Sequence, residues 1–264
     1  MPPAVSDQTP DLSRVRIGAS QHGLDIVGNA AHECDGVALA PLDRSSNDLE
    51  LNPEVFRVRV ARPRTVGQDA AMLVQRRYQW RGYHARPTVD DANLFTFAAY
   101  DSGTLAGTIG VRLDSPEGLR IEELYGAEIA ALRAADRRLT EFTRLAVAES
   151  AASKEVLGAL FHTAALFSHV VRGCSHVTIE VNPRHVAFYR RVLFFKPLGP
   201  ERNSDRVGAP AVALVLELST LMSALEEFFS KPDWRERTGS FFMHWFSPED
   251  AAGIVSRLRR EFSR

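Results

Sequence analysis

The chain of 264 residues has little cysteine and no long apolar run. Cys34 and Cys174 are its two cysteines, and no CxxC, HExxH or clustered His/Cys pattern occurs, so the sequence predicts no metal site. No stretch of about 18 apolar residues is present, which indicates no membrane span. The opening MPPAVSDQTPDLSRV lacks the basic and apolar regions of a signal peptide. We therefore expect a cytoplasmic protein with free thiols.

Glycine motifs for phosphate binding are also missing, since the chain has neither GxGxxG nor a P-loop. Lysine is scarce, because only Lys154, Lys196 and Lys231 are found among the 32 basic residues. Residues 1–53 hold three Arg and eight acidic residues, a net charge of -5, whereas the remainder is mildly basic. With an overall net charge of -1 and no helix-turn-helix signal, the sequence gives no support for nucleic-acid binding.

Hydrophobic periodicity divides the chain into three parts. Residues 1–53 lack a sustained pattern and are predicted to be an irregular acidic leader. Residues 54–219 are predicted to form the main domain, and 220–264 a helical extension packed on the same domain. The patterns predict strands at 56–60, 94–100, 105–114, 139–147, 176–182 and 209–219, with helices at 66–80, 122–138, 154–171 and 184–194. This order predicts an α/β (α+β) fold with a mixed sheet flanked by helices.

Two features of the last 45 residues add to this pattern. SPED at 247–250 predicts a final helix with Ser247 as its N-cap. The aromatic patch FFMHWF at 241–246 has two interpretations: it lines or covers an apolar pocket, or it closes a core.

The stretch NPRHVAFYRRVLF, at 182–194, follows a predicted strand and places a Tyr seven residues after an Asn. A strand, a long helix, a second strand and then this Asn and Tyr resemble the GCN5-related N-acetyltransferase superfamily. The resemblance implies a mostly antiparallel sheet in which two central strands splay apart and hold the pantetheine arm of a thioester. It implies that Asn182 helps to hold that arm and that Tyr189 protonates the leaving thiolate. The alternative for Tyr189 is a ring packed in the core.

The segment AESAASKEVLGAL, at 148–160, departs from the superfamily pattern. Enzymes that use acyl-CoA usually carry a glycine-rich loop here, whose backbone N–H groups bind the CoA pyrophosphate. Its absence favours another carrier of the same 4'-phosphopantetheine, the acidic acyl carrier protein. Basic residues after the second strand could steer such a partner, or they form an ordinary solvated face; they are Arg184, Arg190, Arg191 and Lys196.

A second resemblance is to the acyl-homoserine-lactone synthases. Phrases in the same order as theirs are RRYQW at 76–80, VDDAN at 89–93, GVRLD at 110–114 and TEFTRLAV at 140–147. The matching polar residues are Arg77 (or Arg76), Asp90, Arg112, Glu141 and Arg144, which the resemblance implies as substrate contacts. Asn93 stands where that family tends to have a second acid.

The third resemblance is to the FeeM-like long-chain N-acyl amino acid synthases, and it covers about residues 56–219. Their hallmark phrases resemble RRYQWRGYH, DSPEGLRIEELY, EFTRLAV, SKEVLGALFH and VNPRHVAFYRRVLFFKPLG. It implies a bacterial-type acyltransferase that moves a fatty acyl group from acyl carrier protein, or from acyl-CoA, to a small amine without a cofactor of its own. The alternatives are a lactone-type signal synthase and a non-catalytic regulator that binds acyl groups or carrier protein.

Amide formation from a thioester needs a polarised carbonyl, a deprotonated amine and a leaving thiolate. We expect a backbone N–H near Leu145 to Val147 to bind the carbonyl oxygen, and Glu141 to act as base directly or through water. Arg144 or Arg112 is the candidate for binding an acceptor carboxylate. Glu141 and Arg144 face opposite sides of a regular strand, so both reach one pocket only if a bulge intervenes. The alternatives are ion pairs, Glu141 with Arg144, and Arg112 with Asp114 or Asp90.

Overall fold

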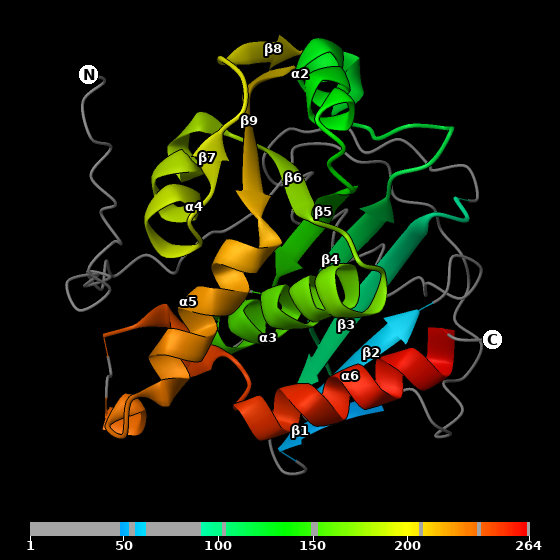
Figure 1. Cartoon of the computed structure of the whole chain (residues 1–264). Helices are drawn as coiled ribbons and strands as arrows, with labels where there is room; N and C mark the ends of the chain where they lie inside the picture. Colours follow the sequence, from blue (N-terminus) through cyan, green and yellow to red (C-terminus); the bar gives the residue numbers. More distant parts are fainter. Residues whose placement is uncertain are drawn as a thin grey trace, which may run out of the picture.

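The computed structural model describes residues 48–52, 56–61, 91–101, 104–148, 153–205, 208–236 and 239–262. The helix predicted at 66–80, and with it Arg77 and Asp90, lie outside the described residues. The elements, shown in Figure 1, are β1 (Asp48–Asn52), β2 (Phe56–Ala61), β3 (Leu94–Asp101), β4 (Thr104–Leu113), α2 (Glu122–Ala134), β5 (Leu139–Val147), α3 (Ser153–Leu166), η2 (Phe167–Val171), β6 (His176–Val181), η3 (Pro183–His185), α4 (Val186–Val192), β7 (Lys196–Pro197), β8 (Arg202–Ser204), β9 (Ala209–Glu217), α5 (Leu218–Ser230), η4 (Trp234–Glu236), η5 (Phe241–His244) and α6 (Pro248–Phe262).

The strands form one mixed sheet in the order β1-β2-β3-β4-β5-β6-β9-β7, with β8 also paired to β9. Among the described pairs, β5 and β6 run parallel and the others antiparallel, as the resemblances imply. β1 lies in the stretch that the sequence predicted to be irregular, because the single short run DLELN carries too little apolar pattern to show a strand. β7 and β8 have two and three residues and leave no pattern at all.

The parallel pair β5 and β6 confirms the expected splay. Their register pairs Leu139 with His176, Thr140 with Val177 and Glu141 with Thr178, and it ends there. β5 continues to Val147 along β4, while β6 continues to Val181 along β9. The two strands therefore separate at Glu141, and their later residues leave a gap within the sheet between their carboxyl-terminal ends, visible in Figure 1.

The two faces of the sheet are covered differently. Helices α3 and α6 lie across one face (Figure 1), and their apolar residues join β2–β6 and β9 in one large core. The ring of Phe142 on β5 packs on Phe161 of α3, with centroids 6.1 Å apart. Side chains alternate along a strand, so Glu141 faces the other side, where the start of α2 packs over a second, smaller core that includes Ile121, Tyr125 and Ile129.

Several element ends differ from the prediction for local reasons. Helix α2 stops at Ala134 rather than at 138, because Asp136 adopts a left-handed backbone (φ 57°). Helix α3 passes into the π-helical turn η2 before Gly173 (φ 69°) ends it. The predicted N-cap of α6 is confirmed, since the Ser247 hydroxyl accepts a hydrogen bond from the backbone N–H of Asp250 (3.2 Å).

Candidate active site

A cavity of about 680 Å³ lies between the turn before β3, the end of β4 and the loop that leads into α2, and none of its described lining residues belongs to β5. One wall comes from the turn before β3, another from the loop between β4 and α2, and the side chain of Arg112 on β4 contributes to it. The described lining residues are Asp91, Ala92, Asn93, Arg112, Glu117, Gly118, Leu119, Arg120, Glu122 and Glu123. Most of these residues carry polar or charged side chains, so the cavity suits a small polar molecule.

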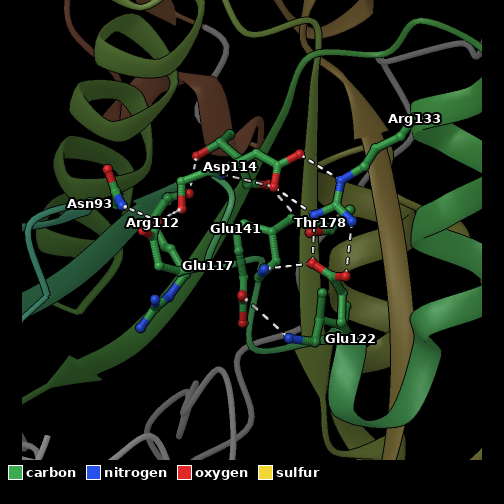
Figure 2. A network of polar contacts seen from close by, with 12 residues as sticks. Asn93, Arg112, Asp114, Glu117, Glu122, Arg133, Glu141 and Thr178 are labelled. Atoms are coloured by element: carbon green, nitrogen blue, oxygen red, sulfur yellow. Dashed lines mark hydrogen bonds and ion pairs between the residues drawn. The ribbon is translucent and has the colours of Figure 1, made fainter. Parts of the chain in front are cut away.

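Arg112 and Glu141 are directly opposite each other in the pairing of β4 with β5, so they share one face of the sheet, and Thr178 continues the row on β6. Glu141 is fully buried. Its Oε2 accepts hydrogen bonds from the backbone N–H groups of Arg120 (2.7 Å) and Ile121 (3.4 Å), at the start of α2 (Figure 2). The carboxylate of the candidate base is therefore held by the loop that lines the cavity.

Arg112 is also buried, and it forms an ion pair with Asp91. Neither Asp114 nor Asp90 is seen in this role: Asp114 binds Arg133 instead, and Asp90 lies outside the described residues. The buried Arg112 Nε has no hydrogen-bond partner among the described residues. A buried guanidinium N–H without a partner is costly. A ligand in the cavity that accepted a hydrogen bond from this N–H would remove that cost.

Arg144 lies in a bulge of β5, the condition that the sequence sets for Glu141 and Arg144 to reach one pocket. Thr108 of β4 pairs with Ala146, and Gly110 with Thr143, so one β4 residue lies opposite two β5 residues. Arg144 has a left-handed backbone (φ 51°), and its carbonyl oxygen accepts a hydrogen bond from the Thr108 hydroxyl (3.1 Å). The bulge changes the alternation of β5 just where it leaves β6.

Beyond the bulge, β5 offers a backbone donor to the gap. The N–H of Ala148 donates to the carbonyl oxygen of Ala106, toward β4 (2.8 Å). Successive N–H groups of an antiparallel strand point to opposite edges, so the N–H of Val147 points to the edge that β6 has left. The side chains of Leu145 and Val147 are buried in the large core.

Asn182 directly follows β6, and Tyr189 lies seven residues later on α4. The Asn182 Oδ1 accepts a hydrogen bond from the N–H of Arg184 (3.2 Å), and Asn182 thereby caps η3. Tyr189 on α4 is buried, with its ring against Phe161, Phe188 and Phe195. Burial raises the pKa of the Tyr189 hydroxyl well above its usual value, so the phenol stays protonated at neutral pH.

Basic side chains near α4 are exposed, as the sequence indicated. Arg190, Arg191 and Lys196 are open to solvent, and Arg184 donates to the neighbouring His185. In contrast, the aromatic residues Phe241, Phe242, Trp245 and Phe246 are buried in the large core, which is the second of the two interpretations that the sequence left open.

Several groups at the site were not found by sequence reasoning. Asp91, which forms the ion pair with Arg112, is not among the predicted site residues. The backbone N–H groups that bind Glu141 could not be found from residue types, because every residue except proline has such a group. Glu117 accepts hydrogen bonds from the Ser115 hydroxyl (2.7 Å) and the Asn93 amide (3.3 Å), and the contact with Asn93 joins residues 24 positions apart. The hydrogen bond from Ser115 lowers the pKa of Glu117 and keeps it ionised.

The part of the chain that the structure describes contains no group of three or more His, Cys, Asp or Glu side chains able to hold a metal ion. Cys174 is buried as a free thiol, as expected, while Cys34 lies outside the described residues. None of the described helices combines the length and the apolar character needed to cross a membrane.

The splayed strand pair, the bulge and the flanking helices define the fold of the GCN5-related N-acetyltransferases. The family model of the N-acyl amino acid synthase FeeM matches residues 69–217. The chain therefore belongs to the FeeM family of N-acyl amino acid synthases and is an acyltransferase.

Three solved structures show the extent of the similarity, and the FeeM structure supports the fold. FeeM, an N-acyl amino acid synthase from uncultured soil microbes, is 23% identical, with a TM-score of 0.54 over 71% of this chain and 95% of that one. MesI, a CoA-dependent acyl-homoserine lactone synthase, is 20% identical, with a TM-score of 0.40 over 64% and 81%. Arabidopsis thaliana NAA60 in complex with acetyl-CoA is 15% identical, with a TM-score of 0.45 over 62% and 99%. No curated protein gives a significant match.

Proposed function

We propose that this acyltransferase moves a long-chain fatty acyl group from the thioester of acyl carrier protein, or from acyl-CoA, to the amine of an amino acid or a similar small amine. The observation that carries the proposal is the meeting of two features at Glu141. The gap between β5 and β6 begins at this residue, and the loop that lines the polar cavity holds its carboxylate. A thioester in the gap and an amine in the cavity would meet there.

In the proposed reaction, the pantetheine arm of the donor lies in the gap beside Asn182. The N–H of Val147 donates to the thioester oxygen as negative charge develops; one such donor is typically worth about 3–4 kcal/mol. The amine nitrogen attacks the carbonyl carbon and transfers its proton to Glu141, directly or through water. The C–S bond breaks, and the thiolate takes a proton from Tyr189.

The acceptor is bound in the cavity, and the Arg112 Nε–H, which has no hydrogen-bond partner among the described residues, supports a contact with a carboxylate oxygen. Arg144, Arg77 and Asp90 are proposed as further acceptor contacts. The acyl tail needs an apolar slot. Burial of each CH₂ group contributes about 0.8 kcal/mol of binding free energy, so a long chain would be the main source of donor affinity. The enzyme would use no cofactor beyond the donor's own phosphopantetheine and would work in the cytoplasm.

Acyl carrier protein is proposed as the donor partner because α4 and the residues around it carry four exposed basic side chains, those of Arg184, Arg190, Arg191 and Lys196. The carrier is acidic, so opposite charges would speed the encounter. The sequence also lacks the glycine spacing that binds a CoA pyrophosphate.

Mass spectrometry of lipid extracts tests the proposal. Cells that express the wild type should contain new long-chain N-acyl amino acids, and cells that express Glu141→Ala or Tyr189→Phe should contain about a hundredfold less. A product that appears only with S-adenosylmethionine and carries a lactone would assign the lactone-type activity instead. Folded wild type that binds acylated carrier protein and yields no acyl amide would reject the enzyme in favour of the binding regulator.

A further inference from the structure

Arg133 joins the two ends of the loop that lines the cavity. Its Nε and Nη2 donate to the two carboxylate oxygens of Asp114 (2.8 and 2.6 Å), at the end of β4. Its Nη1 and Nη2 donate to the two oxygens of Glu122 (2.8 and 2.5 Å), at the start of α2. Figure 2 shows the guanidinium between these two acids. Bidentate contacts of this kind fix position as well as charge.

The loop between the two acids, residues 115–121, is short and internally bonded. The Glu122 carboxylate also accepts from the N–H of Leu119 (2.6 Å). Gly118 has a left-handed backbone (φ 79°), and a Cβ there would come within 2.9 Å of the Glu122 carboxylate. Glu122 therefore packs on the turn and connects it to Arg133.

The same loop supplies the donors that hold the candidate base. The N–H groups of Arg120 and Ile121 bind the Oε2 of Glu141, and both residues lie next to Glu122 in the chain. Arg133 itself is absent from the described cavity lining. Its contacts among the described residues lead to the cavity through Glu122 and the loop.

We propose that Arg133 is a positioning residue: by clamping Asp114 to Glu122 it fixes the loop whose backbone N–H groups orient the Glu141 carboxylate toward the acceptor amine. This inference rests on the proposed function of Glu141 as base. A base must lie within hydrogen-bond reach of the proton it takes, and a displacement of about 1 Å costs up to about a hundredfold in rate.

Arg202 on β8 offers a matched control, because it contacts α2, the helix that carries Arg133. Arg202 pairs with Glu128 (2.6 Å), donates to the Leu124 carbonyl oxygen and lies over the ring of Tyr125. It therefore also anchors α2, but through contacts that lie beyond the loop and away from Glu141. Arg133→Met and Arg202→Met should cost similar stability while differing in their effect on the reaction. Asp114→Asn weakens the clamp from the β4 side without touching the cavity lining.

The test measures kcat and KM with acylated carrier protein and amino acid acceptors, beside melting temperatures. Arg133→Met and Asp114→Asn should lower kcat about tenfold to a hundredfold and leave the donor KM within about twofold, whereas Arg202→Met should keep kcat. In a double-mutant cycle, Arg133→Met should cost almost nothing further on Glu141→Gln. Equal kcat values for the two Met variants, or multiplied losses in the double mutant, would overturn the inference.

Amide hydrogen exchange provides a readout that does not need turnover. Arg133→Met should speed exchange at the N–H groups of Arg120 and Ile121 about tenfold or more, and Arg202→Met should not. If the wild type shows no acyl transfer, the proposed function fails, and the exchange data still decide whether Arg133 holds the loop. Unchanged exchange in Arg133→Met would reject the clamp even in an active enzyme.

Discussion

At the scale of single residues, Tyr189 is predicted from the sequence to be catalytic, and the structure places its ring among aromatic side chains. Its buried ring contacts Phe161, Phe188 and Phe195, and burial raises the pKa of its hydroxyl. Tyr189→Phe keeps the ring, so we expect the melting temperature to change by no more than a few degrees. If the hydroxyl protonates the leaving thiolate, single-turnover rates should fall about a hundredfold.

Tyr125→Phe is the matched control for this prediction. The Tyr125 hydroxyl donates to the backbone carbonyl oxygens of Pro200 (2.9 Å) and Ala211 (2.8 Å), away from the gap. Its removal leaves buried acceptors with fewer partners and should cost about 1–3 kcal/mol of stability at unchanged turnover. The reverse pattern, full turnover in Tyr189→Phe, would assign Tyr189 to packing alone.

Residue types and their spacing are enough to locate part of this site. The order of polar landmarks predicts Glu141 and Arg112, and the structure places them opposite each other on neighbouring strands. The alternative pairing of Arg112 with Asp114 is wrong, because Asp114 binds Arg133; Arg112 pairs with Asp91, and Asp90 lies outside the described residues. Arg133 escapes sequence reasoning because its partners are 11 and 19 residues away, beyond the three- and four-residue spacings at which side chains of a helix meet.

At the scale of elements, the strands with clear alternation are predicted within one or two residues, and the splayed pair is confirmed. The sequence makes a bulge the condition for Glu141 and Arg144 to share a pocket, and the register shows one at Arg144, although Arg144 is not among the described lining residues of the cavity. The π-helical turn after α3 and the short strands β7 and β8 are not predicted, because their geometry depends on tertiary contacts that leave no local pattern.

The exposed cations of α4 lead to a prediction about donor choice. Arg190→Glu with Arg191→Glu should lower kcat/KM for acylated carrier protein about tenfold or more at low salt, through slower association. The effect should shrink as ionic strength rises, and acyl-pantetheine, which lacks the acidic protein, should react as with the wild type. Steady-state kinetics with both donors at two salt concentrations provide the measurement.

Arg259→Glu with Arg260→Glu is the control for charge, because these residues are equally exposed on α6 and the double change alters net charge by the same amount. If both double variants slow the carrier-protein reaction alike, the effect reflects overall charge rather than docking on α4. That result would remove the argument for carrier protein as the donor partner.

At the scale of the whole molecule, we propose that residues 220–264 fold with the acyltransferase domain as one unit. Residues of α5, η5 and α6 share the large core with the sheet. Gly158 on α3 lies so close to η5 that a Cβ would come within 2.3 Å of the His244 carbonyl oxygen. Gly158→Ala should therefore lower stability by about 1–3 kcal/mol in one cooperative transition, measured by thermal unfolding.

Gly126→Ala is the matched change for that prediction. Gly126 lies in α2 with nothing within 4 Å of the added Cβ, so alanine should raise stability by about 0.5–1 kcal/mol through its helix propensity. Two separate transitions in Gly158→Ala, the first with activity retained, would show instead that the extension is a unit of its own.

The core shared by α3 and the extension should also make stability depend on pH. His162 on α3 is buried, stacks on Phe246 with ring centroids 5.1 Å apart, and accepts the Phe246 N–H at Nδ1 (3.1 Å), so the ring is neutral. Burial lowers its pKa to about 3, whereas the unfolded chain binds this proton below about pH 6.5. Between these values the unfolded state holds more protons, so stability falls as pH falls through this window.

At pH 5 the contribution lost by His162 is about 2 kcal/mol relative to pH 7.5. His176 and His244 also have lowered pKa values through burial and act in the same direction, so the comparison must isolate one ring. Urea unfolding of the wild type and of His162→Gln at both pH values does this: the wild type should lose about 2 kcal/mol more than the variant. Equal losses would mean that the folded state binds the proton of His162 as readily as the unfolded state does. The assignment of a buried, neutral ring would then be wrong.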